Sequence, residues 1–259
     1  MEKIQNIYKV VSNEQLCPQY WRLVFDAPAI IKEVKPGQFV HIRTNEDGLE
    51  PFFRRPFSVY RALKHVEIFY DVKGPGTKLL SAKKKGDTLD VLGPLGTGFV
   101  MPPHETKQVV MIGGGIGVAP MLILSDMLKS LRYNMILIYG GRSRAHVYPM
   151  KEFKDNGVRV YIATDDGSLG FKGRVIGLFD KIVPDPKTTY IYTCGPNPMM
   201  KAVQEFAGEH QLKGQAACEE IMACALGACL GCSIETTKGY KTVCYDGPAF
   251  PLDEVKFHE

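Results

Sequence analysis

The sequence lacks any long apolar run, since none of its 259 residues lies in an uninterrupted stretch of about 18 apolar side chains. We therefore expect no transmembrane helix. The first ten residues carry charges and have no apolar core, so we expect no secretory signal peptide. The charge excess is also small, because 32 Lys and Arg face 28 Asp and Glu. A net charge of +4 does not indicate nucleic acid as the main partner.

Cysteine is scarce over most of the chain and concentrated near its end. Five of the seven cysteines lie between Cys218 and Cys244. A secreted disulfide framework normally spreads an even number of cysteines along the chain. The crowding favours a metal or cluster site in a reducing compartment instead, so we expect a cytoplasmic protein.

The pattern of apolar runs and turns divides the chain into three segments of an α+β multidomain fold. Residues 1–103 show short apolar runs separated by turns such as Pro36-Gly37, which predicts an antiparallel β-barrel or sandwich with one clear helix at 76–84. From 104 to 212, apolar strands alternate with helical stretches, which predicts an α/β domain with a parallel sheet. Residues 213–259 are too short to bury much apolar surface, so we expect an inorganic centre there.

Four cysteines in the last segment follow the plant-type [2Fe–2S] spacing, although the gap before the fourth is shorter than in plant-type ferredoxins. They are Cys224, Cys229, Cys232 and Cys244. Two sulfide-bridged irons need four thiolates, and the glycines of this loop suit a backbone whose N–H groups turn toward sulfur. A zinc site also accepts four thiolates but favours paired C-x2-C units, and one such pair is present. Unligated thiols are the third alternative. Cys218 lies outside the spacing and is interpreted as a packed thiol.

Two turns in the α/β segment are candidates for nucleotide binding. The first follows the apolar strand 109–112 and opens a helix, where N–H groups and the helix dipole can receive a pyrophosphate. It is not a strict G-x-G-x-x-G, and close packing of helix on strand is the alternative. The second turn ends the strand 190–193, and ligands of parallel sheets bind at such carboxyl ends. The candidate residues are Gly113, Gly114, Gly115 and Gly117 in the first turn, and Cys194 and Gly195 in the second.

A third motif, Arg55-Pro56-Phe57-Ser58, lies in the β segment. A cofactor with a phosphate and a ring system needs a cation, a flat apolar surface and a hydroxyl group close together. Strand alternation places Arg55 and Phe57 on one face and Pro56 and Ser58 on the other, so a strand with surface arginines is the alternative. Gly76-Thr77 begins the predicted helix and offers free N–H groups to a second phosphate.

Taken together, these motifs resemble the ferredoxin–NADP reductase superfamily, and within it the family of electron-transfer subunits of type B dihydroorotate dehydrogenases. The resemblance covers about residues 5–250. It implies an FAD-binding barrel at 1–103, an NAD-binding domain at 104–212 and a [2Fe–2S] domain at 213–259. The residues that carry it are Arg55–Ser58, Gly76-Thr77, 93–96, 113–120, 164–168, 194–196 and the four clustered cysteines with Glu220 ahead of them.

The resemblance also implies roles for single residues. Arg55 corresponds to the residue that meets the FAD pyrophosphate, and Ser58 to the one that meets the flavin ring. A second FAD-contacting strand corresponds to Phe69, Tyr70 and Asp71, and the phosphate-binding helix start to Gly76 and Thr77. Relatives often carry a basic residue where Asp71 stands, so at this position only backbone contacts are carried over. The clustered cysteines correspond to the four cluster ligands.

The implied chemistry joins carriers that exchange different numbers of electrons. Nicotinamide exchanges two electrons as a hydride and a [2Fe–2S] cluster passes one, so a flavin, which does both, is expected between them. In the family, dihydroorotate is oxidised at the FMN of a separate catalytic subunit, and electrons reach NAD⁺ through the cluster and FAD during pyrimidine (UMP) biosynthesis. This implies an NAD-linked oxidoreductase subunit, a heterotetramer of two copies of each chain, and no general acid or base here.

Other readings of the sequence stay open. One is the flavin and iron–sulfur subunit of a ferredoxin:NADP oxidoreductase or hydrogenase complex, and another is a zinc-stabilised nucleotide-binding regulator without catalytic activity. The apolar residues around the cysteines favour contact with a partner or packing against the flavin domain. No acidic residue follows the strand ending at Tyr139 to hold a ribose hydroxyl, whereas Arg142 and Arg144 suit a 2′-phosphate. The resemblance alone favours NAD.

Overall fold

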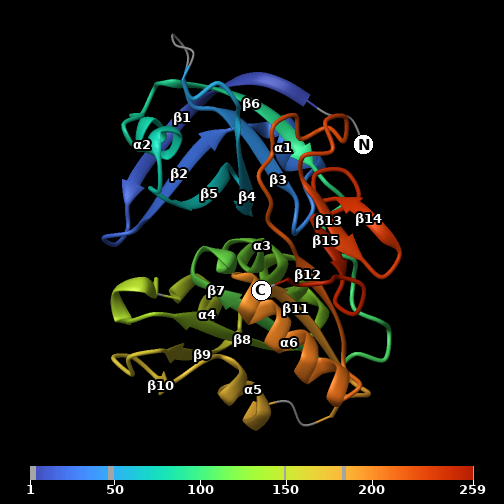
Figure 1. Ribbon diagram of the computed structural model, residues 1–259. Helices are drawn as coiled ribbons and strands as arrows, with labels where there is room; N and C mark the ends of the chain where they lie inside the picture. Colours follow the sequence, from blue (N-terminus) through green and yellow to red (C-terminus); the bar gives the residue numbers. More distant parts are fainter. Residues whose placement is uncertain (1–3, 46–49, 149, 183–184, 259) are drawn as a thin grey trace.

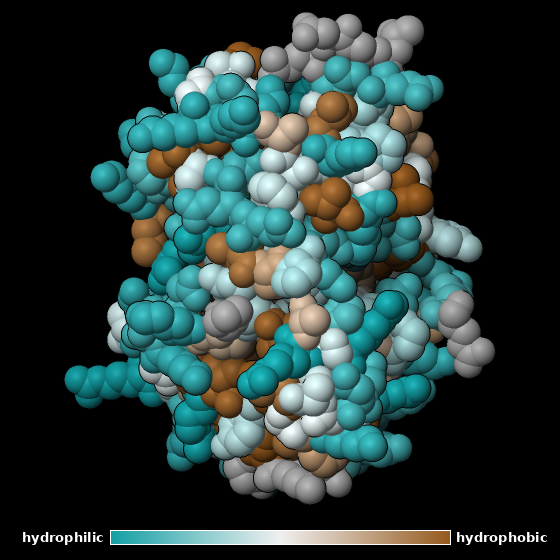
Figure 2. All heavy atoms as spheres, turned by 90° about the vertical axis from the view of Figure 1, so that its left-hand side faces the viewer, coloured by the Kyte–Doolittle hydropathy of each residue, from teal (hydrophilic) through white to brown (hydrophobic). Residues whose placement is uncertain are grey.

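The computed structural model describes residues 4–45, 50–148, 150–182 and 185–258. The chain forms an N-terminal barrel, a nucleotide-binding-type α/β unit below it in Figure 1, and a C-terminal segment that runs along both. None of the helices in these ranges is long and apolar enough to cross a membrane. On the side shown in Figure 2, hydrophilic residues cover most of both units and hydrophobic residues form separate patches.

The expected antiparallel barrel is confirmed, and it is closed in the order β1-β2-β5-β4-β3-β6. On β5, Val66 and Ile68 point into the barrel core, while Phe69 packs on the other side toward the α/β unit. This alternation follows from the two-residue period of a strand. The barrel elements are β1 (Ile4–Gln15), β2 (Tyr20–Asp26), α1 (Pro28–Glu33), β3 (Phe39–Arg43), β4 (Arg55–Ala62), β5 (Val66–Asp71), α2 (Pro75–Ser81) and β6 (Thr88–Leu95).

The expected parallel sheet is also present, with the order β10-β9-β8-β7-β11-β12-β15. Its central strand, β7, is buried along its whole length, which explains its continuous apolar sequence. The elements are β7 (Gln108–Gly114), η1 (Gly115–Val118), α3 (Ala119–Leu128), η2 (Lys129–Leu131), β8 (Asn134–Gly141), η3 (Arg144–His146), α4 (Lys151–Asp155), β9 (Arg159–Thr164), β10 (Phe171–Lys172), α5 (Ile176–Ile182), β11 (Thr189–Cys194) and α6 (Asn197–Glu209).

The cysteine-rich segment begins and ends as part of that sheet. β12 (Lys213–Ala217) pairs in parallel with β11, and β15 (Ala249–Pro251) pairs antiparallel with β12. Between them, the chain leaves the sheet, forms the cysteine loop and then a hairpin of β13 (Ser233–Thr236) and β14 (Gly239–Thr242). The cysteine loop is therefore anchored at both ends to the central sheet.

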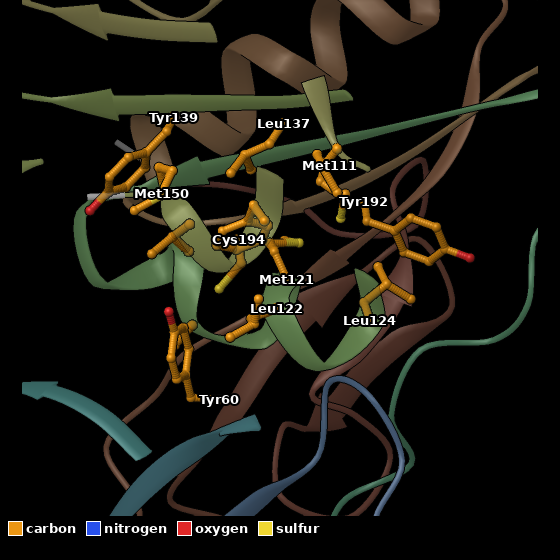
Figure 3. Packing of buried hydrophobic residues seen from close by; sticks show 14 of the residues in the cluster. Tyr60, Met111, Met121, Leu122, Leu124, Leu137, Tyr139, Met150, Tyr192 and Cys194 are labelled. Carbon is orange, nitrogen blue, oxygen red and sulfur yellow. The ribbon is translucent and has the colours of Figure 1, made fainter. Parts of the chain in front are cut away.

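A buried cluster joins the barrel to the sheet. Tyr60 and Phe69 of the barrel pack with α3 and with Tyr148 of the α/β unit, and Figure 3 shows Tyr60 in the same cluster as Leu122 and Cys194. The rings of Phe69 and Tyr148 have centroids 5.2 Å apart. This apolar contact fixes the face where the two units meet.

Candidate functional site

A cavity of about 580 Å³ lies where the barrel, the sheet and the C-terminal segment meet. Its walls come from β4 and β5, from the start of α2, from η1 and α3, and from residues 217–222 after β12. Segments far apart in the sequence therefore build one site. The predicted cofactor residues that line it are Arg55, Pro56, Phe57, Ser58, Phe69, Tyr70, Asp71, Thr77, Gly117 and Cys194.

The Arg-Pro-Phe-Ser strand contributes all four of its residues to the cavity, although strand alternation separates them into two faces. Arg55 is the first residue of β4. Its Nη1 donates to the carbonyl oxygens of Phe53, at 2.5 Å, and Arg54, at 3.4 Å. The guanidinium thus lies beside a cavity that has room for an anion, while bonded to the backbone of its own loop.

Strand β5 contributes two aromatic rings to the cavity wall, together with a carboxylate that is paired with a lysine. Phe69 and Tyr70 are both 2% exposed. The Asp71 carboxylate lies 3.1 Å from the ammonium of Lys73, which also lines the cavity. A basic side chain thus pairs with the carboxylate of Asp71 at the cavity wall.

At the start of α2, Thr77 lines the cavity, whereas Gly76 does not. Thr77 Oγ1 accepts hydrogen bonds from the N–H groups of Lys73, at 3.0 Å, and Gly74, at 3.2 Å. Gly76 is buried behind the wall, and a β-carbon added to it would stand 3.2 Å from Arg55 Nε. The helix start and the arginine side chain are thus packed against one another.

The two glycine-containing turns of the sheet pack on each other. A β-carbon on Gly117 would overlap the carbonyl group of Cys194, and one on Gly195 would stand 3.0 Å from the backbone nitrogen of Gly114. Gly113 packs equally closely on Val118. Close approach of backbones therefore requires these glycines, whether or not a nucleotide is bound. Among the predicted turn residues, Gly113, Gly114, Gly115 and Gly195 are not in the cavity wall.

Several cavity residues carried no motif that singled them out as cofactor contacts. The chain after β12 adds Cys218, Glu219, Glu220, Ile221 and Met222 to the wall. Burial raises the pKa of Cys194, and burial with the nearby charge of Glu220 raises the pKa of Cys218 to about 12. Both thiols are therefore neutral. The family resemblance at Glu220 and the apolar residues around the cysteine motif pointed to this stretch.

The four spaced cysteines converge in a loop rich in N–H···S hydrogen bonds. The N–H groups of Leu226 and Cys229 both donate to Cys224 Sγ at 3.4 Å. Gly227 N–H donates to Cys244 Sγ at 3.2 Å, and the Cys244 N–H lies 3.5 Å from Cys232 Sγ. Donors aimed at sulfur stabilise thiolates.

The sulfur atoms form two pairs. The Cys229 N–H donates to Cys224 Sγ, and the Cys244 N–H donates to Cys232 Sγ. Burial disfavours the Cys224 thiolate, but the N–H groups of Leu226 and Cys229 outweigh it and lower the pKa to about 6. Burial and the Cys232 thiol raise the pKa of Cys244 to about 12. Two pairs of sulfurs, with N–H donors around them, fit a cluster of two irons that each take two thiolates.

The loop backbone is held in a costly conformation. Ala225, Gly227 and Leu230 have φ angles of 56°, 81° and 58°. For the two residues with side chains this region costs on the order of 1 kcal/mol each. Alternation into the left-handed region turns successive N–H groups toward one point, as in anion-binding nests. The strained backbone of this loop is therefore the same backbone whose N–H groups point toward sulfur.

Exposed apolar side chains surround the cysteine loop. Ile221 is 88% exposed and Leu230 is 62% exposed, and Leu226 and Tyr245 are also exposed. Cys229 itself is exposed. The loop therefore lies at the protein surface, with an apolar rim.

Solved structures share this architecture over all or most of the chain. The structure of an NADH-dependent reduced ferredoxin–NADP oxidoreductase, described in connection with flavin-based electron bifurcation, matches with a TM-score of 0.85 and 29% identity over 97% of this chain and 90% of that chain. A ferredoxin–NADP⁺ reductase from Neisseria gonorrhoeae, solved with FAD and NADP, matches with a TM-score of 0.65 over 80% and 91%, at 21% identity. The fold is that of the ferredoxin reductases.

Relatives found by sequence indicate a narrower family than the fold does. A dihydroorotate dehydrogenase B (NAD⁺) electron transfer subunit from Desulforamulus reducens is 36% identical over 95% of this chain and 96% of its own length. The corresponding subunit from Lysinibacillus sphaericus is 36% identical over 97% and 98%. The model of the iron–sulfur cluster binding domain of dihydroorotate dehydrogenase B matches residues 219–256, and that of the oxidoreductase NAD-binding domain matches 111–205.

The chain belongs to the family of electron transfer subunits of dihydroorotate dehydrogenase B (NAD⁺). The resemblance inferred from the motifs is thereby confirmed. The match at 219–256 contains all four spaced cysteines and favours the iron–sulfur interpretation over zinc. An electron transfer subunit works with a catalytic subunit, so membership also implies a catalytic partner.

Proposed function

We propose that this chain holds FAD in the cavity and a [2Fe–2S] cluster in the cysteine loop, and passes electrons from a dihydroorotate-oxidising partner to NAD⁺. The observation that supports it best is continuity: residues 217–222 line the cavity, and Cys224 follows Met222 by two positions. A single short stretch thus leads from one proposed cofactor site to the other.

FAD would supply the exchange between two-electron hydride chemistry and the one-electron chemistry of the cluster. In this proposal Arg55 and the residues at the start of α2, Gly76 and Thr77, hold the pyrophosphate. Pro56, Phe57 and Ser58 lie along the flavin, with Ser58 as its hydrogen-bonding residue. Phe69, Tyr70 and Asp71, on the neighbouring strand β5, form the adjoining part of the wall. The neutral thiol of Cys194 and the adjacent glycine turns, Gly113, Gly114, Gly115, Gly117 and Gly195, form the NAD side.

The cysteines Cys224, Cys229, Cys232 and Cys244 would hold the two irons. The backbone donors to Cys224 and Cys244 stabilise negative charge on sulfur, and the surface position of the loop lets electrons enter from a partner. We propose that the partner is an FMN-containing dihydroorotate dehydrogenase, in a heterotetramer with two copies of each chain. The reducing cytoplasm, where thiols persist, is the location we propose.

Co-expression with such a catalytic subunit tests the proposal. The purified complex should contain FMN, FAD, iron and acid-labile sulfide, and should convert dihydroorotate and NAD⁺ to orotate, NADH and a proton. The chain alone should oxidise NADH with an artificial acceptor but leave dihydroorotate unchanged. A chain that contains zinc and no flavin would contradict the proposal.

The exposed rim supplies a matched variant for the partner contact. Leu230→Asn removes apolar surface while keeping a residue that tolerates the left-handed backbone. We expect normal iron and FAD contents but weaker association with the catalytic subunit. The control is Leu79→Asn, which removes an exposed leucine on α2, far from the loop in sequence.

A second candidate is the corresponding subunit of a reduced ferredoxin–NADP oxidoreductase. It is favoured by the TM-score of 0.85 over almost the whole chain. The two are distinguished by the partner: this candidate predicts electron exchange with reduced ferredoxin and no dihydroorotate-dependent NADH formation in any complex.

A further inference from the structure

Thr44, the residue after β3, has a buried hydroxyl group without a hydrogen-bond partner among the residues that the structure describes. Its exposed fraction is 3%. Leaving a buried hydroxyl unpaired costs roughly 1–3 kcal/mol. Thr44 does not line the cavity and belongs to none of the sequence motifs. The proposed cofactor contacts therefore do not explain why its hydroxyl group is buried without a partner among the residues described.

The hydroxyl of Thr44 and the side chain of Arg55 both border Gly76. A β-carbon on Gly76 would stand 3.2 Å from Thr44 Oγ1 and 3.2 Å from Arg55 Nε, so both atoms border the same point. The strand register agrees, because Arg55 pairs with Ile42, and Thr44 lies two residues further on the same side of β3. Glycine at position 76 leaves this point free of a side chain.

The Nε–H of Arg55 is also without a partner within the described part of the chain, since the hydrogen bonds of this guanidinium come from Nη1. Arg55 Nε–H is a donor, and Thr44 Oγ1 is an acceptor. A guanidinium binds a phosphate best through two N–H groups of its planar fork. A bond from Nε to Thr44 would fix that plane and leave both terminal nitrogens for the anion.

We propose that Thr44 is a positioning residue of the FAD site: its hydroxyl accepts a hydrogen bond from Arg55 Nε when Arg55 leaves the Phe53 carbonyl for the FAD pyrophosphate. The inference rests on the proposed FAD site and adds to it a residue that acts through Arg55. In this arrangement, binding of the anion gives the buried hydroxyl its partner. In the flavin-free protein this hydroxyl, unpaired within the described ranges, stabilises nothing, and its burial is a cost to the folded state.

The test measures FAD affinity of the full chain, freed of flavin, by fluorescence titration. Thr44→Val keeps the shape of the side chain and removes the hydroxyl. We expect the Kd for FAD to rise about tenfold, the range for a hydrogen bond to a charged group. Thr44→Ser should restore affinity. The Tm of the flavin-free Thr44→Val chain should equal or exceed that of the wild type, because an unpaired hydroxyl is lost.

Two further measurements separate positioning from a general packing defect. Riboflavin lacks the pyrophosphate, so its affinity should be the same for Thr44→Val and the wild type. In a double-mutant cycle, Thr44→Val should add little to the loss caused by Arg55→Ala, since Thr44 acts through Arg55. A buried water that satisfies Thr44 independently would give additive losses.

Wild-type FAD affinity in Thr44→Val, additive losses in the cycle, or a Thr44→Ser variant as weak as Thr44→Val would each overturn the inference while leaving the proposed function intact. A wild-type chain that binds no FAD would overturn both together.

Discussion

Two cysteines six residues apart have pKa values shifted in opposite directions. Cys218 lines the cavity next to the sheet, and burial raises its thiol pKa to about 12. Cys224 is in the loop, where burial is outweighed by backbone N–H donors and the pKa falls to about 6. Backbone donors aimed at sulfur, and not sequence proximity, account for the opposite pKa shifts of Cys218 and Cys224.

Two of the four spaced cysteines also differ from each other in pKa. Cys244 is also a spaced cysteine, yet its pKa rises to about 12, because burial and the Cys232 thiol outweigh the single donor from Gly227. Thiolates are required to bind iron, so Cys244 releases its proton on cluster assembly. Backbone donors thus favour the thiolate form of Cys224, whereas burial disfavours that of Cys244.

The largest expected effect comes from exchanging sulfur for oxygen on the two sides of this comparison. Cys224→Ser should lose nearly all iron, acid-labile sulfide and visible cluster absorption, because hydroxyl does not replace a thiolate ligand. Cys218→Ser should keep the iron content of the wild type. Both variants are measured after the same anaerobic purification, with FAD content as the folding control.

Equal iron contents in Cys224→Ser and Cys218→Ser would remove the distinction between ligand and packed thiol. Loss of FAD together with iron in Cys224→Ser would show that the loop supports the cavity and would require chemical reconstitution of the cluster to separate the two effects.

The cysteine loop and the cavity also differ in how far the sequence could predict them. The cluster motif is local, since three of its cysteines lie within nine residues of one another, from Cys224 to Cys232, so spacing alone indicated it. The cavity is assembled from strands, a helix start and residues 217–222, which only the fold brings together. Motifs identified Arg55 and Ser58 as cofactor contacts, whereas Ile221 and Met222 were recognised only as part of the apolar stretch around the cysteines, for which packing against the flavin domain was one alternative.

The fold shows the same limit. Strands with clear apolar runs, such as β5 and β7, were expected correctly. β1 was not, because only Tyr8 and Val10 of its twelve residues are buried and it is held by backbone pairing to β2 and β6. The short helix α1 was also missed. Pairing of β12 and β15 with the sheet is non-local, so composition did not indicate that the C-terminal segment also adds two strands to the central sheet.

A smaller effect is expected from a histidine that, like Cys218, is buried without compensating charge. Burial, with the charges of Arg54 and Arg55, lowers the pKa of His41 from 6.5 to about 4. Because the folded state disfavours the proton, the stability linked to His41 is complete above pH 6.5 and is lost as pH falls toward 4. The loss is at most about 3 kcal/mol.

Chemical unfolding between pH 7 and pH 4 measures this loss. His41→Gln should flatten the decline in unfolding free energy over that interval, whereas His104→Gln, at an exposed position, should follow the wild type. Parallel curves for His41→Gln and the wild type would show that burial of this ring does not control the acid sensitivity.

The smallest effect concerns the backbone that aims the donors. Gly227 has a φ of 81°, and a β-carbon there would stand 2.9 Å from that of Tyr245, whereas one on Gly231 would meet only Cys229 Sγ at 3.7 Å. Gly227→Ala should cost about 1–2 kcal/mol and, by displacing the N–H that donates to Cys244, speed cluster loss to a chelator several-fold. Gly231→Ala should lose its cluster at the wild-type rate. Since both variants add one methyl group to the same loop, equal rates would mean that donor orientation does not protect the cluster, and that ligation by sulfur alone distinguishes this loop from the neighbouring cavity.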